Sequence, residues 1–272
     1  MTDYLDQLPN AQSIIISRPN TRVDGLVAQL NELSTQNLPL KIITCPLIDI
    51  ADYFDWQEVE PKVEPVNFAN FDGVIFISGN AVKHAQARLS EENWTQLIKS
   101  PLYAIGQQTA DVLQSSFEQM TNKPIVKHPQ QMNSEGLLKM PELINTQGQQ
   151  WLIVKGLGGR EKLKIGLQQA GAKVAELHVY QRKLPGLMAQ KQIASYNQLT
   201  PDQTAPIWLI TSLQALNNLW RVLNKDSKNC QVIVSSDRIA NEANKKGFKI
   251  VAQSIDATDK QLASCVKQFI QD

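Results

Sequence analysis

The sequence contains little cysteine, and its thiols show none of the spacings that build a cross-linked framework. Of 272 residues only three are cysteine, Cys45, Cys230 and Cys265, and no two of them form a Cys-x-x-Cys pair. A disulfide framework or a zinc site is therefore not expected. Reduced thiols of this kind fit the cytoplasm best.

Long apolar runs are also absent from the sequence. No stretch approaches the roughly 18–20 apolar residues that a membrane-spanning helix needs. The amino-terminal segment MTDYLDQLPNAQ carries two aspartates and lacks the apolar core of a signal peptide. We therefore expect a soluble, cytoplasmic protein that does not contact a membrane.

Neither sign of charge is in excess. Lysine and arginine number 27, aspartate and glutamate 26, and the formal net charge is +1. Because no general field attracts nucleic acid, we expect no such partner, and an anionic substrate would have to be met by local donors. The apolar fraction of 42% is that of a soluble globular protein. The length suits two domains of about 100–150 residues each.

The sequence does contain a clear strand–loop–helix–strand unit at residues 151–182, WLIVKGLGGREKLKIGLQQAGAKVAELHVYQR. Residues 151–154 are apolar and predict a buried strand, and a glycine-rich turn follows at 155–159. Apolar residues at helical spacing predict a helix over 160–170. A second extended run covers 174–180, and we expect its end to lie between two lobes that hold a substrate.

This unit is half of an internal duplication. Residues 14–50 resemble residues 152–182, because each contains a strand, a loop with an arginine, a helix and a strand. The segment FDGVIFISGNAVKHA likewise resembles PIWLITSLQALNNL, and LYAIGQQTADVL resembles VIVSSDRIANEA. The three units therefore occur twice, in the same order.

The alternation of strands and helices indicates the fold class. The strands are short apolar runs without polar alternation, which is typical of parallel sheets covered by helices on both faces. The sequence therefore predicts an α/β protein with two flavodoxin-like lobes built on parallel sheets. Residues 38–50 are expected to be extended, and the acidic, proline-bearing residues 51–70 to form a surface excursion.

Loops that follow the predicted strands are rich in small polar residues. In such sheets ligands bind beyond the carboxyl ends of the strands, and backbone N–H groups at helix starts suit carboxylate or phosphate. These loops are Ser78-Gly79-Asn80, 106–109, 156–159, Thr211-Ser212 and Ser235-Ser236. For any one loop, the ordinary explanation is that these residues only cap a helix or close a turn. Five such loops together favour anion binding.

Other catalytic and cofactor motifs fit poorly. Gly156-x-Gly158 after a strand, with Glu176 further on, is typical of dinucleotide binding, but Glu161 would place an anion where the pyrophosphate sits. No P-loop is present. The histidines, His84, His128 and His178, share no metal spacing and are interpreted as surface or packing residues. Ser78 and Ser212 lack a G-x-S-x-G setting, so a hydrolase triad is not expected. We expect neither a cofactor nor a metal.

Four cationic side chains fall in the strand-to-helix loops: Arg18, Lys155, Arg160 and Arg238. A cation in the first turn of a helix opposes the helix dipole, so contact with an anion is one explanation and surface solubility the other. Tyr180 follows an apolar stretch and precedes charged residues. It is either an amphipathic interface residue or a proton donor.

With these motifs placed, the whole chain resembles the uroporphyrinogen-III synthase family. The motifs that carry the resemblance, in chain order, are ISRP (16–19), ISGNAV (77–82), AIGQQTA (104–110), SEGLL (134–138), the run 155–182, and ITS (210–212). Each motif is loose alone, and their order and spacing across nearly the whole chain are specific.

The resemblance implies two lobes joined by a two-stranded connector. One lobe would combine residues 1–41 with 183–272, and the other would cover 50–174. The connector strands would be residues about 42–49 and 175–182.

The resemblance also implies a lyase reaction without a cofactor: cyclisation of hydroxymethylbilane to uroporphyrinogen III, with inversion of ring D and loss of water, in haem biosynthesis. Tyr180 matches the family tyrosine thought to act as the acid. The residues expected to bind the carboxylate-rich substrate are Arg18, Ser78, Gly79, Asn80, Gly106, Thr109, Lys155, Gly156, Gly159, Arg160, Thr211, Ser212, Ser236 and Arg238. The expected small-molecule partner is this linear tetrapyrrole. The expected protein partner is the deaminase that precedes the enzyme in the pathway, in transient contact. The protein itself is expected to be a monomer.

One departure from the family pattern leaves a rival function open. In the last third, where the family usually has I-G-x-x-T-A, residues 234–240 read VSSDRIA, so serine replaces the glycine and Arg238 the threonine. The rival is a non-catalytic, bilobal module that binds a polycarboxylate or tetrapyrrole.

Overall fold

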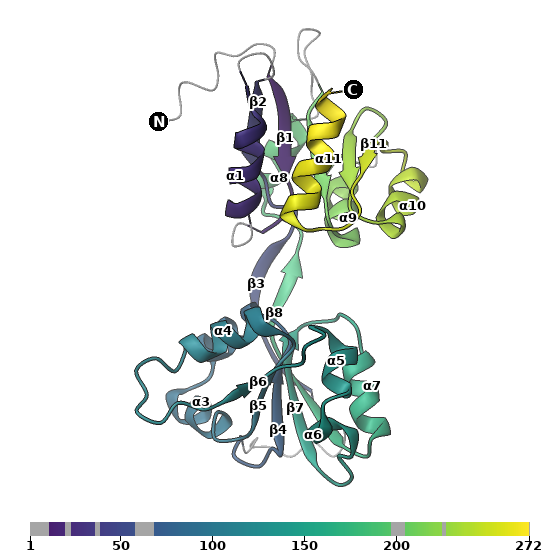
Figure 1. Cartoon of the computed structure of the whole chain (residues 1–272). Helices are drawn as coiled ribbons and strands as arrows, with labels where there is room; N and C mark the ends of the chain where they lie inside the picture. The colour runs from purple at the N-terminus through teal and green to yellow at the C-terminus, as the bar shows by residue number, and fades with distance from the viewer. Residues whose placement is uncertain are drawn as a thin grey trace. The chain divides into compact units, whose positions relative to one another are not determined.

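A computed structural model of the chain describes residues 11–19, 23–35, 39–57, 68–196, 205–224 and 227–271. The chain divides into two compact units (Figure 1). Unit 1 combines Met1–Asp49 with Lys183–Asp272, and unit 2 is Ile50–Arg182. The chain therefore enters unit 2 after Asp49 and leaves it after Arg182.

Within the described residues, unit 1 contains a five-stranded sheet in the order β11-β10-β9-β1-β2. Its strand pairs are parallel. The strands are β1 (Gln12–Ile16), β2 (Leu40–Thr44), β9 (Ile207–Ile210), β10 (Gln231–Val234) and β11 (Lys249–Gln253). The helices are α1 (Asp24–Leu33), α8 (Leu187–Ser195), α9 (Leu213–Val222), α10 (Asp237–Lys245) and α11 (Asp259–Gln271).

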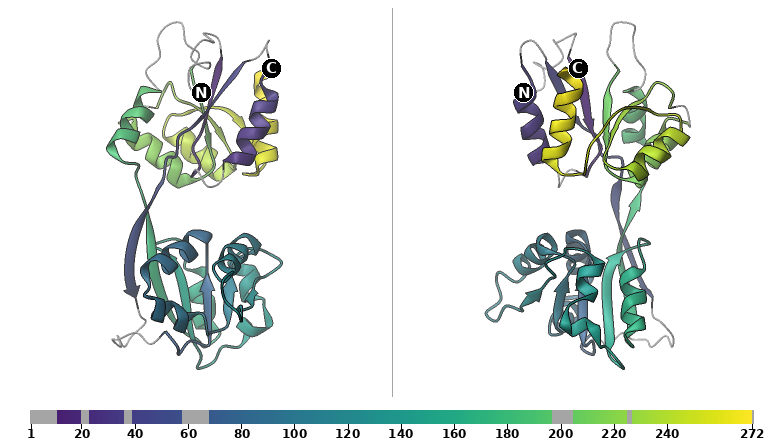
Figure 2. Two further views of the ribbon diagram at one scale, coloured as in Figure 1. Left: turned by 90° about the vertical axis from the view of Figure 1, so that its left-hand side faces the viewer. Right: turned by 45° about the vertical axis from the view of Figure 1, so that its right-hand side comes forward.

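Successive residues of β1 point to opposite faces of this sheet, as the two-residue period of a strand requires. Ile14 and Ile16 belong to the core under α1 and α11, which lie side by side in both views of Figure 2. Ile15 belongs to the core under α8, α9 and α10. The sheet of unit 1 is therefore covered on both faces.

In the part of the chain that the structure describes, unit 2 contains a six-stranded sheet in the order β3-β8-β7-β4-β5-β6. The pairs from β8 to β6 are parallel. The strands are β3 (Asp49–Gln57), β4 (Gly73–Phe76), β5 (Leu102–Ala104), β6 (Val126–Lys127), β7 (Gln150–Gly156) and β8 (Lys173–Lys183). The helices are α2 (Gly79–Arg88), α3 (Glu91–Leu97), α4 (Gln107–Ser115), α5 (Ser134–Leu138), α6 (Pro141–Ile144) and α7 (Lys162–Gln169).

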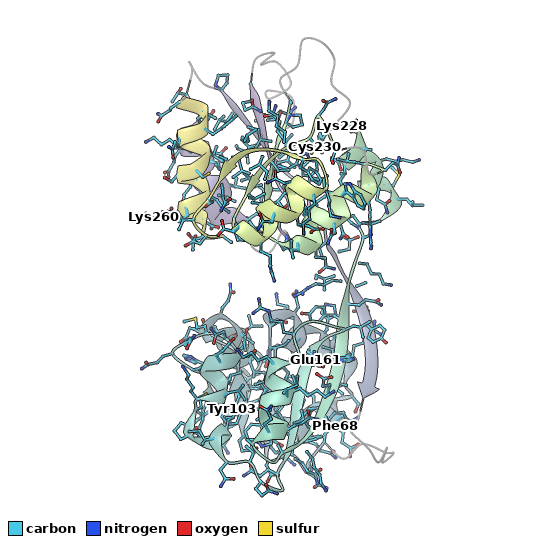
Figure 3. The ribbon with its side chains drawn as sticks, turned by 90° about the vertical axis from the view of Figure 1, so that its right-hand side faces the viewer. Phe68, Tyr103, Glu161, Lys228, Cys230 and Lys260 are labelled. Atoms are coloured by element: carbon cyan, nitrogen blue, oxygen red, sulfur yellow. The ribbon has the colours of Figure 1, made fainter. Side chains whose placement is uncertain are left out.

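The sheet of unit 2 is also covered on both faces. Val74 and Phe76 of β4 pack in the core beneath α2, α3 and α4, whereas Ile75 packs beneath α5, α6 and α7. Figure 3 shows the side chains that fill these layers. The α/β class with largely parallel sheets is therefore confirmed.

The segment between the two sheets differs from the prediction. Residues 42–49 do not form one strand: β2 ends at Thr44, and β3 begins at Asp49 and lies beside β8 in the sheet of unit 2. The strand also continues into residues 51–57, where a surface excursion was expected. Because β3 is an edge strand with one neighbouring strand, it tolerates the acidic residues that obscure it in the sequence. Residues 58–67 of the expected excursion lie outside the described residues.

No helix in the described part of the chain is both long enough and apolar enough to cross a membrane.

Candidate functional site

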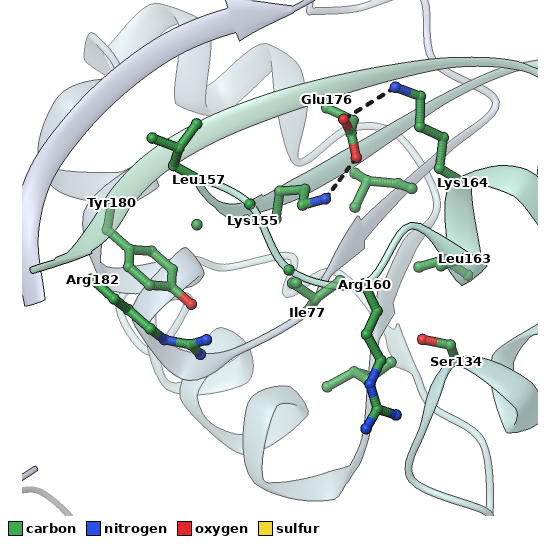
Figure 4. Close-up of a pocket in the computed structure, with 15 residues that line it drawn as sticks. Ile77, Ser134, Lys155, Leu157, Arg160, Leu163, Lys164, Glu176, Tyr180 and Arg182 are labelled. Atoms are coloured by element: carbon green, nitrogen blue, oxygen red, sulfur yellow. Dashed lines mark hydrogen bonds and ion pairs between the residues drawn. The ribbon is translucent and has the colours of Figure 1, made fainter. Parts of the chain in front are cut away.

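A cavity of about 210 Å³ opens in unit 2 at the carboxyl end of β7 (Figure 4). Its walls come from the loop between β7 and α7, from β8, and from the starts of α5 and α7. The lining residues are Ile77, Ile105, Ser134, Ile153, Lys155, Gly156, Leu157, Gly158, Gly159, Arg160, Leu163, Lys164, Glu176, Tyr180 and Arg182. Ligands of parallel sheets bind at this end of the strands.

Glycine shapes the loop of this cavity for two different reasons. Gly158 and Gly159 have φ angles of 74° and 94°, in the left-handed region that favours glycine. Gly156 instead permits a close approach, because a Cβ atom there would lie 2.5 Å from the ring of Tyr180. The backbone N–H of Leu157 also donates to the carbonyl oxygen of Tyr180 at 2.8 Å. The loop is thus held directly against the phenol.

Tyr180 lies in β8 with only 2% of its surface exposed. Its hydroxyl shares a hydrogen bond of 3.2 Å with the Ser78 hydroxyl. Ser78 also accepts from the backbone N–H of Ala81 at 3.1 Å as the N-cap of α2. The guanidinium of Arg182 lies 6.0 Å from the ring centroid. The phenol is therefore buried at the cavity wall, with its hydroxyl fixed by a neighbour.

A buried ion pair forms another wall of the cavity. The ammonium of Lys155 lies 2.8 Å from Oε1 of Glu176, and both residues are 4% exposed. Lys164 reaches Oε2 of the same carboxylate at 3.2 Å (Figure 4). Burial raises the pKa of Glu176, but the hydrogen bonds and charges of Lys155 and Lys164 outweigh it and hold that pKa below its ordinary value. Two ammonium groups thus share one carboxylate, which leaves one positive charge uncompensated within this cluster.

Two arginines add to this charge. Arg160 follows the glycines, and its exposed side chain extends beside Ser134 (Figure 4). Arg182 lies near Tyr180 at the cavity. Local cations of this kind, together with loop N–H groups, suit a carboxylate without a large net charge on the protein.

The structure gathers five of the residues predicted from the sequence in this one cavity: Lys155, Gly156, Gly159, Arg160 and Tyr180. Lys155 lines the cavity, but its ammonium group is directed at the carboxylate of Glu176.

The other predicted residues of unit 2 lie at helix starts. Ser78 caps α2, whose first residues are Gly79 and Asn80. Gly106 caps α4, where a Cβ atom would lie 2.7 Å from Cβ of Met132, and Thr109 is buried in the first turn. Of these, Ser78 contacts the cavity residue Tyr180.

The remaining predicted residues belong to unit 1: Arg18, Thr211, Ser212, Ser236 and Arg238. The guanidinium of Arg18 donates to Oδ1 of Asp259 at 2.5 Å and to the carbonyl oxygen of Ala257.

The hydroxyls of Ser212 and Ser236 accept from helix N–H groups, so the capping explanation holds for these two side chains. Arg238 is exposed in the first turn of α10. Substrate contact by all five residues of unit 1 stays a prediction.

Sequence reasoning did not identify the partners of Lys155. From its sequence position Glu176 suggests only a ribose ligand, and Lys164 and Arg182 have no local sequence signature. In the parallel pairing of β7 with β8, Ile153 lies opposite Glu176 and Lys155 opposite His178. This register places Lys155 and Glu176 on one face. The register is the missing information, because local sequence patterns do not specify it.

Among the described residues, no group of three or more His, Cys, Asp or Glu side chains is arranged so that it could hold a metal ion.

Comparison with known proteins shows the family to which the chain belongs. A family model described as "Uroporphyrinogen-III synthase HemD" matches residues 9–264. The chain belongs to the uroporphyrinogen-III synthase family. The resemblance inferred from the sequence is thereby confirmed, and so is the expected function in haem biosynthesis, with the enzyme class of a lyase.

Relatives in the family agree. The chain is 31% identical to the uroporphyrinogen-III synthase of Proteus mirabilis over 173 residues, which cover 62% of this chain and 80% of the relative. It is 26% identical to that of Salmonella typhimurium over 258 residues, or 92% of this chain and 98% of the relative.

Solved structures share the fold. The uroporphyrinogen-III synthetase of Helicobacter pylori has a TM-score of 0.58 at 16% identity, covering 93% of this chain and 98% of that chain. A mutant uroporphyrinogen III synthase of Thermus thermophilus has a TM-score of 0.52 at 15% identity, covering 96% of this chain and 99% of that chain. At these identities the likeness concerns the fold alone.

Proposed function

We propose that this chain cyclises hydroxymethylbilane to uroporphyrinogen III, with inversion of ring D and loss of water, and that Tyr180 is its proton donor. The observation that carries the proposal is the buried phenol of Tyr180, hydrogen-bonded to Ser78 at the wall of a basic cavity.

The reaction needs a proton at one position and a fixed substrate conformation. Protonation of the terminal hydroxyl lets it leave as water, and the substituted carbon of ring D attacks the resulting azafulvene cation to form a spiro intermediate. The bond from this carbon to its original bridging carbon then breaks, and the bridging carbon bonds to the free α-carbon of ring D, which loses its proton. Ring D is thereby inverted. Unassisted closure of the flexible bilane gives the other isomer. Catalysis is therefore chiefly an orientation effect, to which one acid adds.

Tyr180 is suited to supply the acid. Its phenol carries one proton that it can donate. The Ser78 hydroxyl and the loop at Gly156 restrict where this phenol points. A proton donor must lie within hydrogen-bond reach of the leaving oxygen, and restriction of the phenol keeps the distance short.

Carboxylates of the substrate would meet the cations of the cavity. Arg160 and Arg182 present exposed guanidinium groups, which bind carboxylates in bidentate geometry. We propose that the backbone N–H groups of Gly158 and Gly159 add to them, because the N–H of Leu157 already donates to the carbonyl oxygen of Tyr180. We propose Lys155 as an indirect contributor, because Glu176 already engages its ammonium.

Residues of unit 1 complete the proposal. Arg18, Thr211, Ser212, Ser236 and Arg238 are proposed to contact further carboxylates. We also propose that β3 and β8, along which the chain passes between the units, act as the connector. We also propose that the protein is a cytoplasmic monomer in transient contact with the deaminase that supplies the bilane. Size-exclusion chromatography tests the monomeric state, and co-purification tests the contact with the deaminase.

The test is to supply hydroxymethylbilane to the purified protein and to identify the uroporphyrin isomer after oxidation. The proposal predicts isomer III at a rate that scales with protein concentration. The rival is a module that only binds the polycarboxylate, and it is favoured by the altered loop 234–240, whose Ser236 side chain is used as a helix cap. Isomer I alone, at the spontaneous rate, would support that rival.

A further inference from the structure

A second set of groups contacts Tyr180 from outside the lining of the cavity. The imidazole of His84, in α2, has its centroid 5.6 Å from that of the phenol ring, and the two planes are inclined by 31°. Aromatic rings at this separation attract each other. His84 is therefore packed against the residue proposed as the acid.

The imidazole of His84 is itself oriented by β3. Its Nδ1 lies 2.9 Å from Oδ1 of Asp52. Because an ionised carboxylate only accepts hydrogen bonds, Nδ1 carries the hydrogen in this contact. The hydrogen bond from His84, opposed by partial burial and assisted by Arg88, holds the pKa of Asp52 below its ordinary value. Asp52 therefore stays ionised and fixes both the tautomer and the plane of the ring.

Tyr180 is thus restrained by neighbours of different kinds. Gly156 leaves no room beside the ring, Ser78 binds the hydroxyl, and the guanidinium of Arg182 lies 6.0 Å from the ring centroid. His84 differs from these three because its ring is held in turn by Asp52. A chain of contacts therefore runs from Asp52 on β3 through His84 on α2 to Tyr180 on β8.

We propose that His84 is a positioning residue for Tyr180 and that Asp52 orients it. The inference rests on the proposed function, because it gives His84 its role through the phenol that acts as the acid. Without the imidazole, the phenol ring has space to tilt, and its hydroxyl spends less time within reach of the leaving oxygen. Catalytic rates are sensitive to such displacements, whereas substrate binding by the cations of the cavity is not.

If the contact between His84 and Asp52 served only the stability of the fold, its loss would lower stability, and any loss of rate would follow from unfolding. The side chain of Asp52 is 58% exposed and that of His84 is 21% exposed. A hydrogen bond to a carboxylate that stays this open to solvent contributes little to stability. Loss of the pair should therefore leave the fold intact, so that an effect on the rate reports on the orientation of Tyr180.

The first measurement compares steady-state formation of isomer III by the full-length variants His84→Ala, His84→Phe and Asp52→Ala. We expect His84→Ala to lower kcat roughly three- to tenfold, the size of one aromatic contact, with KM changed less than about twofold. His84→Phe keeps a ring against Tyr180 and should recover most of the rate. The kcat of Asp52→Ala should lie between the kcat of His84→Ala and that of the wild type. The control is Gln86→Ala, an exposed position of the same helix, which should match the wild type.

The second measurement is a double-mutant cycle. If His84 acts through the hydroxyl of Tyr180, His84→Ala should change kcat little in a Tyr180→Phe background, where that hydroxyl is gone. An equal fold-change in both backgrounds overturns the proposal, and so does a wild-type kcat for His84→Ala. A loss confined to KM contradicts it as well. Thermal melting of each variant shows whether it is folded. If His84→Ala does not fold, the test passes to Asp52→Ala, and a wild-type kcat for that variant overturns the proposal.

These outcomes separate the two proposals. Isomer III from the wild type with an additive cycle rejects the role of His84 and leaves the proposed function standing. Absence of isomer III from the wild type rejects both.

Discussion

Lys155 and Glu176 form a buried ion pair at the wall of the candidate site, with 2.8 Å between Nζ and Oε1. The two residues come from adjacent strands, β7 and β8, and the exposed loop of the cavity begins after Gly156, the residue that follows Lys155. Removing one member of a buried pair leaves a charge in a medium that solvates it poorly. The pair therefore forms part of the cavity wall and also contributes to the stability of unit 2.

Glu176→Gln should destabilise the protein by about 3–5 kcal/mol, because it leaves the buried ammonium of Lys155 without a counter-charge. Denaturant unfolding measures the loss. The control is the double variant Lys155→Met with Glu176→Gln, which removes both charges and should recover more than half of the loss. A single variant as stable as the wild type would contradict the importance of the pair.

The pH dependence of stability follows from the same pair. The pKa of Glu176 is lowered from its ordinary value of 4.5 in the folded protein, so its contribution is fully present above that value and is lost as the pH falls through the folded pKa. The difference in unfolding free energy between the wild type and Glu176→Gln should therefore be constant near neutrality and shrink below about pH 4.5. Urea unfolding of both proteins across this range measures it. A difference that grows on acidification would have the wrong sign.

Ser78→Ala should lower both stability and the yield of isomer III, because Ser78 caps α2 and binds the hydroxyl of Tyr180. Ser90→Ala is the matched control: Ser90 caps α3 by accepting from the N–H of Asn93 and has no contact with Tyr180 in the described structure. Each variant should lose about 1 kcal/mol of stability. The ratio of isomer III to isomer I should fall only in Ser78→Ala, and an equal fall in both variants would attribute the effect to stability.

Local patterns predicted much of the fold. The helix predicted over 160–170 is found as α7 (Lys162–Gln169), and its apolar residues Leu163 and Leu167 are buried. The strand β3 was missed because its acidic residues hide an edge strand. The helix α3 was missed although Ser90 caps it and Trp94 and Leu97 form its buried face.

The site was predictable only in part, for a physical reason. Loop glycines and Tyr180 have local signatures, so the sequence identifies them. The partners of Tyr180 and Lys155 depend on which strands and helices become neighbours. Glu176 pairs with Lys155 through the register of β7 and β8, and His84, interpreted from the sequence as a surface or packing residue, reaches Tyr180 from another helix.

The proposed mechanism depends above all on protonation of the leaving hydroxyl by the phenol of Tyr180. The decisive experiment is the rate of isomer III formation by Tyr180→Phe, with KM and the circular dichroism spectrum recorded on the same protein. We expect a fall in kcat on the order of 100-fold, the typical contribution of a general acid. KM and the spectrum should stay close to those of the wild type, so that spontaneous closure to isomer I dominates the product. Isomer III formed by Tyr180→Phe at the wild-type rate and ratio would show that the phenol is not the acid.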